Sequence, residues 1–172
     1  NTPSQDLADS YEVGDTRKEA TIIFRGETLF DGREIPITVE NPMYNQKAYA
    51  SEFTTADQTG KNIRVLRYAE VLLINAEAAL KIGKDAGLPL KLVRNRAGLD
   101  DGNPTEANIW KERRHELAFE HDRFFDLVRQ GRAGEVLRNA GVSFVDGKHE
   151  LFPIPQEQIN RAIGILIQNP NY

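Results

Sequence analysis

His115, Glu116 and His121 come closest to a metal-binding motif in this sequence. Many zinc hydrolases carry His-Glu-x-x-His on a helix, where the two histidines are four residues apart and face the same side. Here the two histidines are separated by six positions, which places them about 240° apart around a helix axis. The sequence has one further histidine, His149. The spacing therefore predicts no metal site.

Glu112, Glu116 and Glu120 follow one another at intervals that a helix places on one face. Glycoside hydrolases use two carboxyl groups about 5 to 9 Å apart, so a glycosidase built on this helix is the enzyme alternative. Arg113 and Arg114 lie beside these carboxylates. Pairing with a cation lowers the pKa of a carboxyl group, whereas a general acid needs a raised pKa. The pattern favours structural ion pairs.

No other motif in the sequence indicates catalysis. Residues 100–103 read Asp-Asp-Gly-Asn, but they lack the alternating oxygen ligands and the distal glutamate of a calcium loop, so they predict a plain turn. The sequence contains no G-x-S-x-G, no Walker glycine loop and no G-x-G-x-x-G. We therefore predict no catalytic residue, no metal and no cofactor.

Residues 41–60 are rich in Asn, Thr, Gly and aromatic residues and have no helical or strand period, which predicts a structured loop. Aromatic rings stack on sugar rings, while tyrosine hydroxyls and side-chain amides hydrogen-bond to sugar hydroxyls. We expect ligand contacts from this loop, chiefly from Tyr44 and Tyr49, with the amides of Asn41, Asn45 and Gln46 as hydroxyl partners. The alternative is that its rings, Phe53 included, cover the central helix.

The central helix is predicted over residues 64–82. At 100° per residue, most of its apolar side chains fall within one arc of about 160°: Val65, Leu66, Tyr68, Ala69, Leu72, Leu73, Ala76, Ala79 and Leu80. Val71 and Ile74 lie on the opposite side, and we expect them to form exposed apolar surface. Gly83 ends this helix and a second one follows over residues 85–96, which completes a helical hairpin.

A long helix is predicted over residues 105–130, with Thr105 as its N-cap and Gly131 as its stop. Its buried side is marked by Trp110, Leu117, Phe124 and Val128. Arg113 and Arg114 lie on or beside that side, so both should be at least partly buried and paired with carboxylates. The candidate partners are Glu70, Glu77 and Asp126.

The remaining elements are short. Residues 21–24 and 35–39 are apolar runs separated by glycine-containing turns, which predicts two short strands or extended segments. Residues 133–139 form a short helix. In the tail, Pro153 and Pro155 fix an extended segment, and a helical turn begins at Gln156.

The composition limits the possible partners. The 172 residues suit one structural domain, in which a loop-rich segment over residues 1–63 precedes a helical region over residues 64–172. A formal net charge of −4 and a pI near 5.5 argue against a nucleic-acid partner. No window has the roughly 18 apolar residues of a membrane span. The absence of cysteine excludes thiolate nucleophiles, disulfides and cysteine-ligated zinc.

Several of these segments resemble the SusD/RagB family, in the order in which that family carries them. They are residues 67–78, 94–99, 112–120, 123–131, 151–155 and 168–172, while the opening residues 3–17 are similar to a segment from the middle of such proteins. The resemblance implies a mostly α-helical fold, namely a SusD-like C-terminal region. We expect it to contain a helical hairpin, one long helix, extended loop segments and one short β-hairpin.

The resemblance also implies a function. SusD-like proteins bind glycan or another nutrient on the extracellular face of the outer membrane of Bacteroidetes, where a lipid anchor holds the full-length protein. They pass the ligand to a SusC-like TonB-dependent transporter and are not enzymes. Most of the family's tetratricopeptide-like hairpins, and its lipidated cysteine, would lie in an N-terminal portion before Asn1. The family motifs do not identify the ligand.

A helical-repeat adapter for protein partners is the third alternative. Such solenoids need about three or more repeats, because each repeat buries its apolar face against its neighbours. Only residues 64–96 have the shape of such a repeat. The binding protein therefore remains the preferred interpretation.

Overall fold

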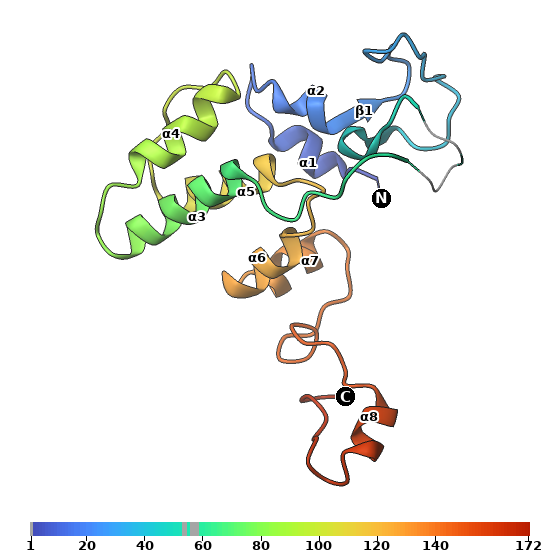
Figure 1. The fold of residues 1–172 in the computed structure, drawn as a ribbon, viewed down its shortest axis with the longest axis vertical. Coiled ribbons are helices and arrows are strands. Elements are labelled where there is room, and N and C mark those ends of the chain that lie inside the picture. Colours follow the sequence, from blue (N-terminus) through green and yellow to red (C-terminus); the bar gives the residue numbers. More distant parts are fainter. Residues whose placement is uncertain (1, 53–54, 56–58) are drawn as a thin grey trace. The chain divides into compact units, whose positions relative to one another are not determined.

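The computed structural model describes residues 2–52, 55 and 59–172 of the chain. It consists of two compact units, Asn1–His121 (unit 1) and Asp122–Tyr172 (unit 2). Within the described residues there are eight α-helices, one 3₁₀ helix and one two-stranded antiparallel sheet (Figure 1). The predicted mostly α-helical class with a short β-hairpin is confirmed. The change of character expected near residue 63 concerns composition and stays a prediction.

Unit 1 contains most of the regular structure. Its elements are α1 (Gln5–Ser10), α2 (Arg17–Thr21), β1 (Ile22–Phe24), β2 (Met43–Asn45), the 3₁₀ helix η1 (Gln46–Ala48), α3 (Tyr68–Lys81), α4 (Gly87–Arg96) and α5 (Glu106–Glu116). Unit 2 contains α6 (Arg123–Arg129), α7 (Ala133–Asn139) and α8 (Gln156–Arg161). None of the helices in the described ranges has the length and apolar character needed to cross a bilayer.

The predicted helical hairpin is present as α3 and α4, which lie side by side in Figure 1. Leu73, Leu90 and Ile109, from α3, α4 and α5, have no exposed surface and form the centre of the main core. Alanines on α3 and on the turn to α4 surround them and let the helices approach closely. Ile109 anchors α5 in this core. The other buried side chains of α5 contact the rest of unit 1.

The start of α3 differs from the prediction. The helix begins at Tyr68, and the preceding Arg67 is extended, with φ −145° and ψ 162°. The guanidinium of Arg67 is bound to α5 side chains, and this contact holds the backbone outside the helix. Val65 and Leu66, predicted for the buried arc, are 89% and 63% exposed.

Of the two alternatives predicted for residues 35–39, the strand is not formed. The partner of β1 is β2, with Ile23 opposite Tyr44 in an antiparallel register. Pro36 lacks an N–H group for a ladder hydrogen bond, and its carbonyl instead accepts a turn hydrogen bond from Val39. Residues 27–35 form an irregular hairpin with a single bridge, Thr28 to Glu34. Ile22 and Met43 of the true pair are buried in a second core together with α1.

The single helix predicted over residues 105–130 was wrong, because α5 ends at Glu116. In a continuous helix the Glu116 carbonyl would accept from the N–H of Glu120. Here that carbonyl accepts from Lys47 Nζ at 2.8 Å and Arg67 Nη2 at 2.6 Å, while the Glu120 N–H turns to Leu117. The chain then passes through left-handed conformations at Phe119 and His121, with φ 64° and 76°. Residues 117–122 contain no glycine or proline that would end a helix. The helix ends because of these tertiary contacts.

Other features of this region agree with the sequence. Thr105 caps α5 by accepting from the Asn108 N–H. Arg113 is buried, as expected, with 4% of its surface exposed. Arg114 is partly buried and pairs with Asp6 of α1, which was not among the candidate partners. Trp110 is half-buried and donates to Glu77 Oε1 at 3.2 Å.

In unit 2, helix α7 has the predicted bounds and packs with α6 around Leu127, Ala133 and Phe144. The proline-containing tail has no helix or strand at residues 151–155, and α8 begins at Gln156, as predicted. Gln168 holds this tail, since its amide donates to the Ile154 carbonyl and accepts from the Ile154 N–H, at 2.9 and 2.8 Å. Unit 2 therefore depends on loop hydrogen bonds as well as on a small core.

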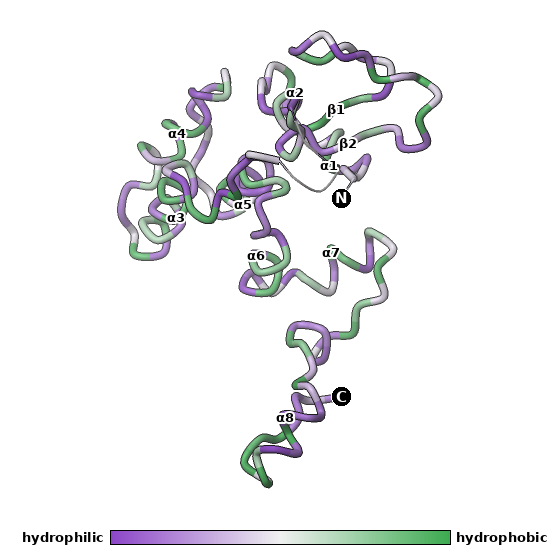
Figure 2. The backbone as a smooth tube through the Cα atoms, turned by 45° about the vertical axis from the view of Figure 1, so that its right-hand side comes forward, coloured by the Kyte–Doolittle hydropathy of each residue, from purple (hydrophilic) through white to green (hydrophobic). Residues whose placement is uncertain are grey.

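The outer side of α3 is apolar and exposed, as the sequence predicted. Val71 and Ile74 are 44% and 49% exposed. On α4, Leu88 and Leu92 are 60% and 45% exposed, and hydrophobic residues are visible in green on both helices in Figure 2. Unit 1 thus combines a buried seam between the two helices with apolar side chains on their outer surfaces.

Leu90 and Leu92 provide a direct test of this arrangement. Leu90→Ala removes a fully buried side chain and should lower the free energy of unfolding by about 2 to 5 kcal/mol. Leu92→Ala, on the same helix, should cost less than about 1 kcal/mol because its side chain is half-exposed. Urea unfolding followed by circular dichroism measures both. Equal losses in the two variants would contradict the described packing of α4.

Candidate functional site

Unit 1 is organised around a buried group of ion pairs at the end of α5. Glu116 is 2% exposed, and its carboxylate contacts Arg17 Nη1 at 3.0 Å, Arg67 Nη1 at 2.5 Å and the guanidinium of Arg96. These arginines come from α2, the start of α3 and the end of α4. One carboxylate therefore joins four segments that are far apart in sequence.

The neighbouring carboxylates on α5 are paired in the same way. Glu112 contacts Arg17 at 2.5 Å and Arg94 at 3.0 Å. Glu120, beyond the helix end, contacts Arg67 Nε at 2.5 Å and Lys47 Nζ at 2.6 Å. The ion pairs predicted for these three glutamates are present, with cations contributed from elsewhere in unit 1.

This pairing sets the acidity of the carboxyl groups. Burial raises the pKa of Glu116, but hydrogen bonds from Arg67 and Arg17 outweigh burial and hold that pKa below its usual value. The pKa of Glu120 is likewise lowered, because hydrogen bonds from Arg67 and Lys47 outweigh its burial. A general acid for glycoside hydrolysis needs the opposite shift. The geometry at Glu116 and Glu120 supports a framework role.

His115 is a core residue of unit 1. It has no exposed surface, stacks on Tyr11 with ring centroids 4.6 Å apart, and its Nε2 is hydrogen-bonded to Ser10 Oγ at 3.0 Å. Burial, aided by the charge of Arg17, lowers the pKa of His115 to about 4. Within the described ranges, no group of three His, Asp or Glu residues could hold a metal ion.

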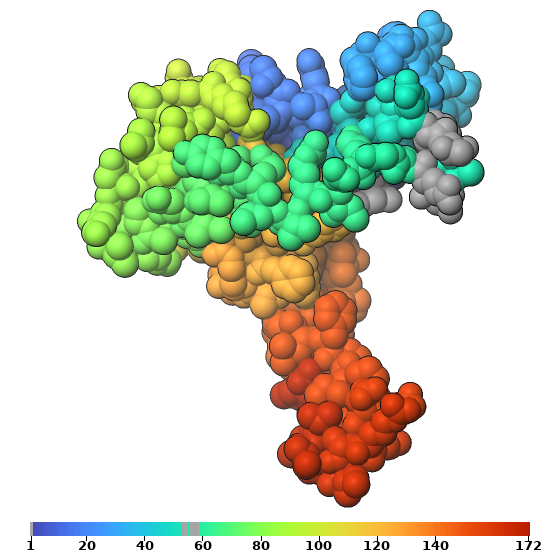
Figure 3. Space-filling model, in the orientation of Figure 1, coloured from blue at the N-terminus to red at the C-terminus, as the bar shows by residue number. Residues whose placement is uncertain are grey.

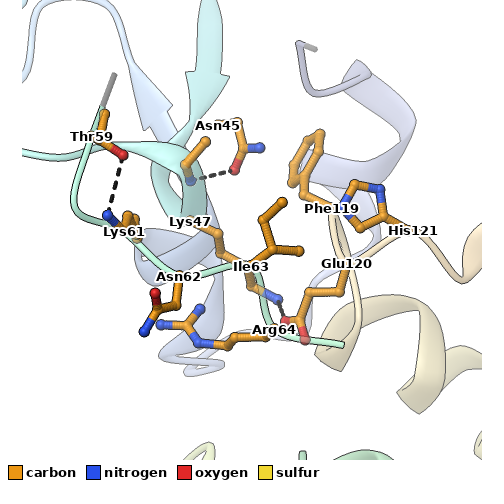
Figure 4. Close-up of a pocket in the computed structure, with 11 residues that line it drawn as sticks. Asn45, Lys47, Thr59, Lys61, Asn62, Ile63, Arg64, Phe119, Glu120 and His121 are labelled. Atoms are coloured by element: carbon orange, nitrogen blue, oxygen red, sulfur yellow. Dashed lines mark hydrogen bonds and ion pairs between the residues drawn. The ribbon is translucent and has the colours of Figure 1, made fainter. Parts of the chain in front are cut away.

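A surface pocket of about 260 Å³ lies beside this framework. It is lined by Asn45, Lys47, Ala48, Thr59, Lys61, Asn62, Ile63, Arg64, Phe119, Glu120 and His121. Figure 4 shows Lys61 and Asn62 on one side and Phe119 and His121 on the other, with Ile63 between them. The walls come from η1, from the segment that leads to α3 and from the turn after α5, so the ion pairs at Glu116 and Glu120 fix two of them.

An exposed aromatic pair forms the second candidate surface. The rings of Phe30 and Tyr49 meet edge to face with centroids 6.0 Å apart, and Phe30 is 77% exposed. The Tyr49 hydroxyl donates to Asp31 Oδ2 at 2.6 Å, and the Arg33 guanidinium lies 5.5 Å from the Tyr49 ring centroid. Residues 25–50, blue to cyan in Figure 3, stand at the surface of unit 1 apart from the green α3–α4 hairpin.

The predicted ligand residues are divided between these features. Asn45 lines the pocket, where its Oδ1 accepts from the Ala48 N–H at 3.2 Å and caps η1. Tyr49 belongs to the aromatic pair. Tyr44 lies on β2 and Gln46 in η1, and neither lines the pocket. Asn41 does not line the pocket either. The role of these five residues in binding stays a prediction, and Phe53 lies outside the described residues.

The sequence analysis missed Phe30 and the cations of the pocket. Phe30 precedes Asp31-Gly32, a pair typical of turns, which place their flanking side chains at the surface. The sequence therefore contained a signal for an exposed Phe30 ring. Arg64 fell at the predicted start of the central helix and Lys61 just before it. The sequence pattern therefore did not show that both would line a pocket wall.

Comparison with known proteins gives a consistent match. The model of the SusD family matches residues 1–172. A curated relative, SusD-like protein P2 of Formosa agariphila, is 31% identical over 135 residues, which is 67% of this chain and 27% of the relative. The chain thus spans about a quarter of that relative's length.

Solved structures agree with this match. Surface glycan-binding protein A from Bacteroides thetaiotaomicron, in complex with laminarihexaose, has 30% identity and a TM-score of 0.78 over 98% of this chain and 41% of its own. A laminarin-binding SusD-like protein has 34% identity and a TM-score of 0.78 over 100% and 38%. Surface glycan-binding protein A from Bacteroides fluxus has 32% identity and the same TM-score, over 98% and 40%.

The central role of Glu116 can be tested by removing its charge. Glu116→Gln leaves buried arginines without their shared carboxylate and should lower the free energy of unfolding by about 3 to 5 kcal/mol. Glu106→Gln, on the same helix, breaks an exposed pair with Lys81 and should cost at most about 1 kcal/mol. Chemical unfolding compares them. A loss below 1 kcal/mol in Glu116→Gln would rule out its organising role.

The pKa shifts also predict a pH dependence of stability. The pKa of His115 is about 4 in the folded chain and about 6.5 when unfolded, so the unfolded state binds the extra proton between these values. Stability should therefore fall by about 3 kcal/mol as the pH drops through this window. Below about pH 4.5, Glu116 and Glu120 act in the same direction, since their folded pKa values are lowered.

Unfolding measured from pH 7 to pH 4 tests this dependence. His115→Gln should flatten the slope, whereas His121→Gln, at an exposed position, should keep it. Should His115→Gln fail to fold, NMR titration of the native protein decides, because the His115 ring should titrate near pH 4. Titration near pH 6.5 would contradict the assignment.

Proposed function

Since this chain belongs to the SusD family, we propose that it is part of a cell-surface protein that binds a glycan and delivers it to a SusC-like TonB-dependent transporter. The observation that carries the proposal is the likeness, over nearly the whole chain, to a surface glycan-binding protein crystallised with laminarihexaose. The full-length protein would act at the extracellular face of the outer membrane through a lipid anchor. Catalysis has no role in this proposal.

The first ligand class to consider is a glucan of the laminarin type. One similar solved structure is a laminarin-binding SusD-like protein at 34% identity, and another is a complex with laminarihexaose at 30% identity. The chain spans less than half of either structure. We therefore expect it to contribute part of the binding surface.

The geometry of the aromatic pair supports a sugar-binding role. Phe30 presents an exposed ring, and the Tyr49 ring is held by Asp31 and Arg33, so little side-chain freedom remains to be lost on binding. Sugar rings stack on such faces through their C–H groups. We also propose Tyr44 and Asn45 of β2 and Gln46 of η1 as ligand contacts.

Calorimetric titration of the full-length protein with laminarihexaose and a panel of other glycans tests this function. Phe30→Ala and Tyr49→Ala should each weaken binding about three- to tenfold, the value of a stacking contact. Tyr68→Ala is the matched control, because Tyr68 is 71% exposed on α3, away from the pair. Its affinity should be unchanged.

Two results would contradict the proposal. Release of reducing ends from any glycan of the panel would indicate turnover and an enzyme. Native affinity in a folded Phe30→Ala, Tyr49→Ala double variant would place the binding surface elsewhere.

A further inference from the structure

The pocket beside Glu120 has an excess of positive charge. Its lining contains the cations of Lys47, Lys61 and Arg64, and among the described residues Glu120 is its one carboxylate. Both oxygens of Glu120 are already occupied. Oε1 accepts from Lys47 Nζ at 2.6 Å and Arg67 Nη2 at 3.0 Å, and Oε2 accepts from Arg67 Nε at 2.5 Å. This carboxylate is therefore satisfied and does not compensate the other two cations.

Lys61 and Arg64 both line this pocket, and neither has a carboxylate partner in the part of the chain that the structure describes. Burial lowers the pKa of Lys61, and the charge of Arg64 lowers it further, which shows that the two cations repel each other. The Lys61 ammonium donates to the Tyr49 carbonyl at 2.6 Å and keeps two further donors. An anion between the two side chains would relieve the repulsion and accept hydrogen bonds from both.

The rest of the lining suits a sugar ring better than a bare anion. Phe119 and Ile63 supply apolar surface, and Asn45 and Asn62 supply amide groups that can pair with hydroxyls. The volume of about 260 Å³ is slightly below the usual range of small-molecule pockets, about 300 to 1,000 Å³, so it suits one sugar unit rather than a chain. A charged sugar would use all three kinds of group: apolar surface for its ring, amides for its hydroxyls and cations for its negative charge.

The backbone of this wall is strained. Phe119 and His121 adopt left-handed conformations that favour glycine, with φ 64° and 76°, and both side chains line the pocket. Such conformations are unfavourable for residues other than glycine and concentrate at ligand sites. Here the contacts of Lys47 and Arg67 with the Glu116 carbonyl maintain them.

We propose that this pocket binds an acidic sugar unit, whose carboxylate or sulfate ester is held between Lys61 and Arg64. The inference rests on the proposed glycan-binding function and adds a ligand class to it. A neutral part of the same glycan would stack on Phe30 and Tyr49, while the charged substituent would enter the pocket. Carboxylate and sulfate present the same negatively charged oxygens to the two cations.

Three glucose derivatives that differ chiefly at C6 test the proposal: the methyl glycoside of glucuronic acid as its free carboxylate, glucose 6-sulfate and methyl glucoside. NMR titration of the complete chain should show at least one of the two charged sugars binding about tenfold tighter than methyl glucoside, the value of one charge-assisted hydrogen bond. That advantage should shrink as sodium chloride is raised from 50 to 500 mM. Which charged sugar binds tighter identifies the source of the anion.

Variants of the two cations complete the test. Lys61→Gln and Arg64→Gln should each remove most of the advantage of the charged sugar, with affinity for methyl glucoside unchanged. Lys84→Gln is the matched control, because Lys84 is an exposed cation on the turn between α3 and α4. It should behave as the native chain does.

Equal affinity for all three sugars, or an unchanged preference in Arg64→Gln, would overturn the inference. Inorganic sulfate bound as tightly as glucose 6-sulfate would also overturn it, since the site would then be a plain anion site. The proposed glycan-binding function can be refuted independently of this inference. Laminarihexaose binding that persists in Lys61→Gln and Arg64→Gln would support glycan binding even if the acidic-sugar site were absent, whereas no binding to any glycan would refute both.

Discussion

Unit 1 depends on one buried carboxylate. Glu116 is bound by Arg17, Arg67 and Arg96, which come from three segments that are separated from one another and from α5 in sequence. An unpaired buried charge lowers the free energy of unfolding. Each arginine must therefore point its guanidinium at the carboxylate of Glu116. The apolar core of α3, α4 and α5 is generic in comparison. The ion pairs determine which helix ends meet, and they thereby fix the position of the loops attached to those ends.

The same interactions determine the shape of the pocket. Lys47 and Arg67 donate to the backbone carbonyl of Glu116, which removes the acceptor that would have continued α5. The chain turns there, and Phe119 and His121 take left-handed conformations on the pocket wall. The pocket is thus a consequence of ending a helix by tertiary contacts. Lys61 and Arg64, which have no carboxylate partner among the described residues, lie beside the ion pairs of Glu116 and Glu120.

The sequence predicted those elements whose signals are local. The helix at residues 133–139, the hairpin and the cap at Thr105 follow from glycine, capping and apolar periodicity. The helix predicted over residues 105–130 and the strand considered for residues 35–39 are absent for the same reason. Both predictions rested on local propensity, whereas the structure of these segments depends on contacts with residues that are distant in sequence. No local pattern shows that Lys47 will reach the Glu116 carbonyl or that Met43 will pair with Phe24. The candidate site was only partly foreseen for the same reason.

The division between framework and site also explains why family motifs identify the fold better than the ligand. Glu116, Arg67, Arg94 and Arg96 all lie in the segments that resemble the SusD family, and their side chains are committed to buried or half-buried ion pairs. A substitution at Glu116 would leave a buried charge unpaired, so selection for folding acts on it directly. Phe30, Lys61 and Arg64 lie outside those segments, and their exposed side chains can change without disturbing the core. Such a framework can retain its motifs while its loops are adapted to different glycans.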